Sequence, residues 1–277
     1  MRAALVQLTS TDEPEVNTRL LAETVAQGAA GGADIVLTPE VSNLVSLDRE
    51  WQRTHARTEA EDPTLAAMRK VARDHGLWIL LGSLALRADE PAEERLVNRS
   101  ILLSPEGVVV ARYDKIHMFD VEIDATETFR ESRGFRPGRR AVVADTPLAR
   151  VGMTICYDLR FPALYRALAE AGAQILTVPA AFSPVTGAAH WEVLLRARAI
   201  ETGCFVLAPA QCGRHPTRGD RARTTHGHSL AVAPWGEILA DGGTEPGITF
   251  VDLELSEVDR ARARVPALEH ARPFEGP

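Results

Sequence analysis

Short runs of valine, isoleucine and leucine recur along the whole chain, and helix-like segments lie between them. Such runs are typical of strands that are covered on both faces of a sheet. Because the strand and helix patterns alternate, the chain is predicted to have an α/β fold. The predicted strands are Ala3–Leu8, Ile35–Thr38, Trp78–Leu86, Asn98–Leu103, Val108–Tyr113, Val151–Cys156, Gln174–Val178, Cys204–Pro209, Ser229–Ala233 and Ile248–Leu253.

Helical spacing of apolar residues fills several of the intervals between these strands. One predicted helix covers residues 16–25 and ends before Gly31, and another begins at an Asp62 N-cap and ends at Gly76. A helix around Trp191 ends at Gly203, and the segment PALYRALAEAG forms one more. Turn sequences join other strands directly, so the sheets are expected to be mixed. Ten strands exceed what one compact sheet commonly holds, which favours two sheets with outer helices.

Bulk composition excludes several classes of protein. The net charge of −7 gives no electrostatic basis for binding nucleic acid or an anionic membrane, and the arginine clusters at 133–140 and 214–223 are interpreted as solvated loops. No apolar run approaches the roughly 18–20 residues that a membrane span needs. Three cysteines without close pairing argue against a disulfide framework and indicate a cytoplasmic protein. We find no linker, and expect one domain over residues 1–277.

Three strand-like runs end close to chemically competent side chains, namely Glu40, Lys115 and Cys156. The lysine is the most informative, because only Lys70 and Lys115 among 31 basic residues are lysines. A compact ammonium suits a small oxyanion, whereas the planar guanidinium of arginine matches a carboxylate or phosphate. Since α/β sheets bind ligands beyond the carboxyl ends of their strands, we expect the three groups to meet there. Together they indicate acyl transfer by a cysteine nucleophile.

Each of the three residues also has a simpler interpretation on its own. Cys156 stands where a strand meets a turn before a helix, which predicts a stabilised thiolate, but a buried cysteine is commonly a core residue. Cys204 and Cys212 are interpreted as such core residues. Glu40 is predicted to have a raised pKa in an apolar pocket, although it could be a loop glutamate. Lys115 alone would fit a surface lysine.

Longer motifs surround these residues: LTPEVSNL at Glu40, YDKIHMFDVE at Lys115 and GMTICYDLRFPALYR at Cys156. With PAAFSPVTGAAHWEVLLRARAIETGCFVLAPAQCG and HGHSLAVAPWGE, they make the chain resemble the nitrilase (carbon–nitrogen hydrolase) superfamily over nearly its whole length. The resemblance implies a four-layer α-β-β-α sandwich that forms a homodimer or a higher homo-oligomer, with the tail from about residue 265 to 277 near the contact. It implies amide hydrolysis through a thioester, with no metal or other cofactor.

The resemblance also assigns roles to residues. Glu40 would be the general base, Lys115 the cation beside the oxyanion and Cys156 the nucleophile. The backbone N–H of Tyr157 would add a second oxyanion donor. A second glutamate of the family would be Glu131, although Glu127 lies close to it in the sequence.

The segment AHWEVLLRARAIETGCFVLAPAQCGRH is most similar to the branch that includes the deaminated glutathione amidases and the ω-amidases. This implies a small amide substrate, either deaminated glutathione, which yields 2-oxoglutarate and cysteinylglycine, or α-ketoglutaramate. Such anionic substrates need a cation, for which Arg160 is the candidate, unless it pairs with Asp158. The other residues expected to shape the acyl pocket are Phe182, Thr186 and His190, whereas Trp191 fits core packing equally well.

Other classes remain as alternatives. A Cys–His hydrolase would pair Cys156 with one of four histidines, namely His117, His190, His226 or His228. A zinc site could use His226 and His228 with Cys204 and Cys212. The cysteine and histidine spacing lacks a C-x₂-C pair or an H-E-x-x-H helix, so we expect no metal. A catalytically silent binding protein of the same fold is the non-enzyme alternative.

Overall fold

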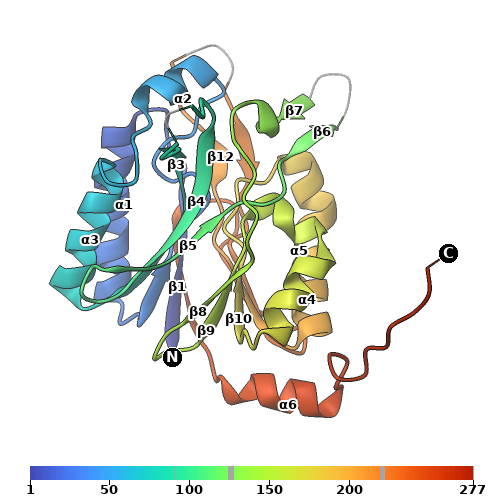
Figure 1. Cartoon of the computed structure of the whole chain (residues 1–277). Coiled ribbons are helices and arrows are strands. Elements are labelled where there is room, and N and C mark those ends of the chain that lie inside the picture. The colour runs from blue at the N-terminus through green and yellow to red at the C-terminus, as the bar shows by residue number, and fades with distance from the viewer. Residues whose placement is uncertain (91, 124–127, 219–221, 277) are drawn as a thin grey trace.

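Two six-stranded mixed sheets lie face to face, and helices cover the outer face of each sheet (Figure 1). The computed structural model describes residues 1–90, 92–123, 128–218 and 222–276. The predicted four-layer α-β-β-α sandwich is confirmed.

The first sheet consists of β1 (Arg2–Gln7), β2 (Ile35–Leu37), β3 (Trp78–Arg87), β4 (Leu96–Leu103), β5 (Val109–Asp114) and β16 (Gly247–Asp252). Its strand order is β16-β1-β2-β3-β4-β5, with β1, β2 and β3 parallel and the other neighbours antiparallel. Helices α1 (Pro14–Ala30) and α3 (Pro63–His75) connect the parallel strands and cover the outer face.

The second sheet consists of β8 (Val142–Asp145), β9 (Arg150–Met153), β10 (Ile175–Thr177), β11 (Phe205–Ala208), β14 (Leu230–Val232) and β15 (Ile238–Asp241). Its order is β15-β14-β11-β10-β9-β8, and β9, β10 and β11 are the parallel strands. They are connected by α4 (Pro162–Glu170) and α5 (Pro184–Thr202), which cover the other outer face of the sandwich.

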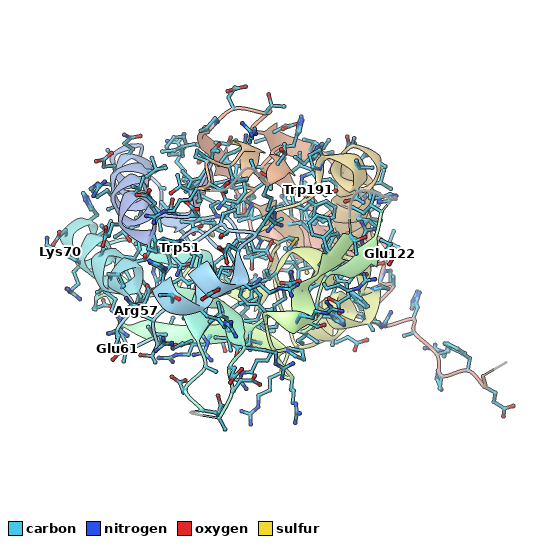
Figure 2. The ribbon with its side chains drawn as sticks, turned by 90° about the horizontal axis from the view of Figure 1, so that it is seen from above. Trp51, Arg57, Glu61, Lys70, Glu122 and Trp191 are labelled. Atoms are coloured by element: carbon cyan, nitrogen blue, oxygen red, sulfur yellow. The ribbon has the colours of Figure 1, made fainter. Side chains whose placement is uncertain are left out.

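Smaller elements complete the fold. The hairpin of β6 (Asp120–Glu122) and β7 (Thr128–Arg130) lies with α2 (Arg49–His55) at one end of the sandwich, the end that Figure 2 views from above. The others are β12 (Cys212–Arg214), β13 (Thr224–His226), α6 (Ser256–Arg264) and the 3₁₀ turns η1 (Glu131–Arg133) and η2 (Cys156–Arg160). Beyond α6, the C-terminal tail extends away from the body (Figure 1).

The packing of β1 explains why the parallel strands have continuous apolar sequences. Ala3 and Leu5 lie in the apolar layer between the two sheets. Ala4 and Val6 point the opposite way and pack with Leu21 in the layer beneath α1 and α3. All four side chains of the strand are fully buried, so both faces of β1 are covered.

The predicted helix ends are also observed. The side chain of Asp62 accepts a hydrogen bond of 2.8 Å from the backbone N–H of Leu65, which caps α3. Gly76 and Gly203 follow α3 and α5 in the left-handed conformation, with φ of 62° and 61°. Within the described ranges, no helix combines the length and the apolar character that a membrane crossing needs.

Candidate active site

Glu40, Lys115 and Cys156 line a single cavity of about 270 Å³. The three residues follow the ends of β2, β5 and β9 by one to three positions, so they leave the two sheets at the same edge of the sandwich. The structure thus brings together three groups that are 41 to 116 residues apart in the chain.

The carboxylate of Glu40 is buried and held by three donors. Its Oε1 accepts hydrogen bonds from Nζ of Lys115 and Nδ2 of Asn98, both at 2.9 Å. Its Oε2 accepts one of 2.8 Å from the backbone N–H of Ala181, which belongs to the second sheet's side of the cavity. The carboxylate is therefore fixed by groups from both halves of the sandwich.

The ammonium of Lys115 lies between two carboxylates. Its Nζ is 2.9 Å from Oε1 of Glu40 and 2.9 Å from each carboxylate oxygen of Glu131. Glu131 in turn accepts a hydrogen bond of 2.6 Å from the backbone N–H of Phe119, and Nδ2 of Asn98 lies 3.3 Å from its Oε1. Three charged groups thus share one buried network, in which Glu131 orients the lysine. The alternative second glutamate, Glu127, lies outside the described residues.

Backbone strain marks two residues of the site. Cys156 has a φ of 48° and Val41, directly after Glu40, has a φ of 47°. Such values are unfavourable for residues with a Cβ, at about 1–3 kcal/mol each, and persist only where the surroundings enforce them. The backbone N–H of Cys156 donates to the carbonyl of Pro179 at 2.9 Å, and that of Val41 donates to Oγ of Ser83 at 2.8 Å.

Asp158 joins the cysteine turn to the end of β5. This buried carboxylate accepts hydrogen bonds from the backbone N–H of Ile155 at 2.9 Å and from the hydroxyl of Tyr113 at 2.7 Å. It also accepts a bond of 2.7 Å from Nδ1 of His117. Because Tyr113 and His117 flank Lys115, Asp158 fixes the lysine relative to the nucleophile turn.

Gly82 in β3 allows the two sheets to approach each other below the site. A Cβ atom on it would lie 1.8 Å from the carbonyl oxygen of Thr38 and 2.5 Å from Cβ of Pro179. Thr38 leads into the Glu40 segment, and the carbonyl of Pro179 holds the Cys156 backbone. Glycine at this position therefore permits the contact that brings the carboxylate and the thiol together.

The electrostatics of the site favour a neutral thiol beside an ionised carboxylate. Burial raises the pKa of Glu40, but the charges of Lys115 and Arg223 and the hydrogen bonds to the carboxylate outweigh it, so the pKa lies below 4.5. Burial and the charge of Glu40 raise the pKa of Cys156. Burial alone would lower the pKa of Lys115. The charges of Glu131 and Glu40 outweigh burial, so the pKa of Lys115 lies above its usual value. Thus the predictions of a raised Glu40 pKa and a stabilised thiolate are wrong, because nearby cations outweigh burial at Glu40, whereas burial and the adjacent carboxylate outweigh the cation at Cys156.

Comparisons with known proteins agree with this geometry. The model of the carbon–nitrogen hydrolase family matches residues 2–263. The chain belongs to the carbon–nitrogen hydrolase family. A deaminated glutathione amidase of Yersinia enterocolitica is 42% identical over 270 residues, which are 97% of this chain and 92% of that protein.

Solved structures of family members have the same fold. The NITFHIT protein of C. elegans superposes with a TM-score of 0.89 at 35% identity; the match covers 98% of this chain but only 65% of that longer protein. A mutant of the amidase from Nesterenkonia sp. AN1 has a TM-score of 0.80 at 29% identity, and the match covers 98% of this chain and 94% of that one. In it, the acetamide moiety of fluoroacetamide is attached covalently to the active site cysteine. The predicted membership of the nitrilase superfamily and the predicted class, a hydrolase of non-peptide carbon–nitrogen bonds, are confirmed.

The residues predicted to bind substrate are only partly in this carbon–nitrogen hydrolase cavity. Phe182 and Thr186 line it together with Tyr157, whereas Arg160 and His190 are not among the lining residues. Nη2 of Arg160 lies 3.3 Å from Nδ1 of His190, and its guanidinium lies over the rings of Phe182 and Tyr157 at 5.6 and 5.9 Å. Arg160 therefore lies behind the aromatic wall, and its contact with substrate stays a prediction.

Sequence reasoning missed several residues of the cavity, among them Asn98, Arg223 and Arg49. Asn98 binds both Glu40 and Glu131, and within the described part of the chain its buried Oδ1 has no hydrogen-bond partner. Arg223 lines the cavity and donates a hydrogen bond of 2.6 Å to the carbonyl of Ala181. The interpretation of the arginine cluster at 214–223 as a solvated loop is therefore wrong for Arg223. Arg49 belongs to α2.

The remaining candidates have structural surroundings. Cys204 and Cys212 are fully buried and do not line the cavity. Both observations agree with their interpretation as core residues. Trp191 packs against Phe182 and donates its indole N–H to the carbonyl of His228 at 2.8 Å. It therefore supports the cavity wall from behind.

Proposed function

We propose that this chain is a cysteine-dependent amidase that hydrolyses deaminated glutathione to 2-oxoglutarate and cysteinylglycine. The observation that supports this reaction is that a carboxylate, an ammonium and a thiol line one cavity. The substrate is supported by the near full-length similarity to an amidase of that name.

Acylation begins with a proton transfer from the thiol of Cys156 to the ionised carboxylate of Glu40. The sulfur attacks the amide carbonyl carbon, and the carbonyl electron pair moves to oxygen. The ammonium of Lys115 and the backbone N–H of Tyr157 stabilise this oxyanion, a contribution of about 2.7–4 kcal/mol for a typical single donor. When the tetrahedral intermediate collapses, the carbon–nitrogen bond breaks and Glu40 returns its proton to the departing amine.

Deacylation repeats these steps with water. Glu40 removes a proton from water, the oxygen attacks the thioester carbon, and the carbon–sulfur bond breaks as Glu40 gives that proton to the departing sulfur of Cys156. Glu131 keeps the ammonium of Lys115 between the two carboxylates during both steps.

The test of the reaction is Cys156→Ala. This variant should fold, as judged by circular dichroism, and should form no thioester and no product, whereas Cys212→Ala should retain turnover. Steady hydrolysis by Cys156→Ala would refute the mechanism.

The substrate has alternatives within the same chemistry, namely an ω-amidase reaction on α-ketoglutaramate or hydrolysis of another small amide or N-carbamoyl compound. A panel of deaminated glutathione, α-ketoglutaramate, an aliphatic amide, an N-carbamoyl amino acid and a nitrile separates them. Deaminated glutathione should have the highest kcat/KM. A higher value for a compound that is not an α-keto γ-amide would reject the proposed substrate but keep the reaction class.

We further propose a single domain over residues 1–277 that forms a homodimer in the cytoplasm. Val193 and Ile200 of α5 are 67% and 57% exposed, and Val265 and Phe274 of the tail are 57% and 91% exposed. Such apolar surface is typical of a protein contact, and analytical ultracentrifugation should give twice the chain mass. A thiol nucleophile works only while it is reduced, which suits the cytoplasm.

A further inference from the structure

The cavity has a charged rim as well as a reactive floor. Glu40, Lys115 and Cys156 are buried, whereas Arg49 at the start of α2 and Leu47 before it are exposed to solvent and line the same cavity. Leu47, Arg49 and Arg130 form this rim, whereas Phe182, like the reactive groups, is a buried part of the lining. An amide substrate whose acyl part lies among the buried residues would therefore extend its leaving group toward the rim.

Two arginines of the rim differ in their partners. The guanidinium of Arg130 forms an ion pair of 2.7 Å with Glu122 and donates to the carbonyls of Val121 and Phe129. Within the described ranges, no carboxylate lies within 4 Å of the guanidinium of Arg49. The only hydrogen bond of its side chain to a described residue is one of 3.1 Å from Nη2 to the backbone carbonyl of Arg130. Thus one rim arginine is neutralised and the other retains donors and charge.

Arg49 is nevertheless held in place. Besides its bond to the Arg130 carbonyl, its aliphatic part runs beside Gly134, where an added Cβ would lie 3.8 Å from Cδ of the arginine. A guanidinium that is fixed by one N–H and has others free can bind a carboxylate with two parallel hydrogen bonds. The charges of the cavity floor are largely compensated within the network of Glu40, Glu131, Lys115 and Arg223, so the unpaired charge lies at the rim.

We propose that Arg49 binds the terminal carboxylate of the leaving group and thereby makes the enzyme select amides of a peptide over unsubstituted amides. This inference rests on the proposed function, because deaminated glutathione releases cysteinylglycine, whose glycine carboxylate is an anion remote from the scissile bond. The leaving group of α-ketoglutaramate is ammonia, which has no such anion. Arg49 is thus a specificity-determining residue for the amine side of the substrate.

The experiment compares three substrates: deaminated glutathione, the same compound with its glycine carboxylate converted to an amide, and α-ketoglutaramate. Each is measured with the wild type, Arg49→Gln, Arg49→Lys and the control Arg53→Gln. Arg53 is exposed on the same helix, one turn further on, and does not line the cavity, so its replacement removes the same charge without touching the rim.

The wild type should prefer deaminated glutathione over its amidated form by about tenfold in kcat/KM, mainly through KM; tenfold corresponds to about 1.4 kcal/mol. Arg49→Gln should lose this preference and should lower the ratio of kcat/KM for deaminated glutathione to that for α-ketoglutaramate by the same factor. Arg49→Lys should keep part of both ratios, and Arg53→Gln should keep them at the wild-type values.

Two results would overturn the inference, and they differ in what they leave standing. If the wild type hydrolyses all three substrates but Arg49→Gln leaves both kcat/KM ratios unchanged, Arg49 does not bind the glycine carboxylate of the leaving group. The proposed function is then unaffected. If the wild type hydrolyses none of the three, the proposed function is wrong and the inference falls with it.

Discussion

Both carboxylate oxygens of Glu131 lie 2.9 Å from Nζ of Lys115. This bidentate contact, together with the bond from the Phe119 N–H to Glu131, fixes the ammonium at the base of the cavity. The lysine therefore cannot turn toward solvent when the carbonyl oxygen of a substrate arrives. Glu131 acts through Lys115 and is a positioning residue in this arrangement.

Replacement of Glu131 by Gln should weaken this constraint while keeping the size of the side chain. We expect kcat to fall by about 10²-fold, since a misplaced oxyanion donor costs about 2.7 kcal/mol, whereas KM should change little. The measurement is steady-state kinetics with the best substrate of the panel. A rise in KM at constant kcat would instead assign Glu131 to substrate binding.

Lys115→Arg tests whether the site needs a compact ammonium. The side chain of Lys115 is 2% exposed, and its Nζ is enclosed by three carboxylate oxygens, so the larger guanidinium fork cannot take its place without moving Glu40 or Glu131. We expect a loss of at least about 10²-fold in kcat.

The matched control for this substitution is Lys70→Arg. Lys70 is the other lysine of the chain, pairs with Asp74 at the surface of α3 and lies at the outer edge of the molecule in Figure 2. It should keep wild-type kinetics. Equal activity of the Lys115 variant and this control would show that any cation serves beside the oxyanion.

Arg223 links the arginine-rich loop to the ionisation of Glu40. Its charge lowers the pKa of Glu40, and its hydrogen bond to the carbonyl of Ala181 holds the residue whose N–H binds that carboxylate. Because the base must be ionised, activity is lost as the pH falls through the pKa of Glu40. In Arg223→Gln the pKa of Glu40 should rise, so the acid limb of kcat/KM should move to higher pH.

Two further variants separate charge from structure in this prediction. Arg223→Lys keeps the charge and should shift the acid limb less, and Arg214→Gln removes an exposed arginine of the same segment and should leave the limb in place. If Arg223→Gln lowers activity equally at every pH, the arginine has a structural role only.

Much of the fold could be predicted from the sequence because its central strands are buried on both faces. All ten predicted strands are present in the two sheets. The strands that were missed are short or lie at edges: β15 has Ile238 and Leu239 exposed, so its apolar residues do not indicate burial. Strands β6 and β7 have three residues each and exist through their pairing with each other, which no local pattern reveals.

The site was predictable to a different degree for each residue. Glu40, Lys115 and Cys156 stand out because they follow apolar strands. Asn98 was hidden inside a predicted strand, and Arg223 was hidden among other arginines. The sign of the Glu40 pKa could not be predicted either, because the opposing charge of Lys115 comes from 75 residues away.

His215 provides a prediction for stability. This fully buried histidine donates its Nδ1–H to the carbonyl of Ser10 at 2.7 Å, and its Nε2 accepts from the hydroxyl of Thr225 at 2.8 Å. Only the neutral ring can accept a hydrogen bond at Nε2 while it donates at Nδ1, and burial lowers its pKa from 6.5 to about 4. The folded protein therefore resists a protonation that the unfolded chain accepts.

The sign of the pH effect follows from this difference. Between pH 6.5 and about 4 the unfolded chain binds more protons at this residue, so the free energy of unfolding decreases as the pH falls through that window, by about 3 kcal/mol in total. Above pH 6.5 the contribution is constant. His215→Gln should be less stable at pH 7, because Gln cannot keep both bonds, but its stability should fall less steeply between pH 7 and pH 4.5. Urea unfolding of both proteins at these two pH values measures the difference, and identical slopes would mean that folding does not lower the pKa of His215.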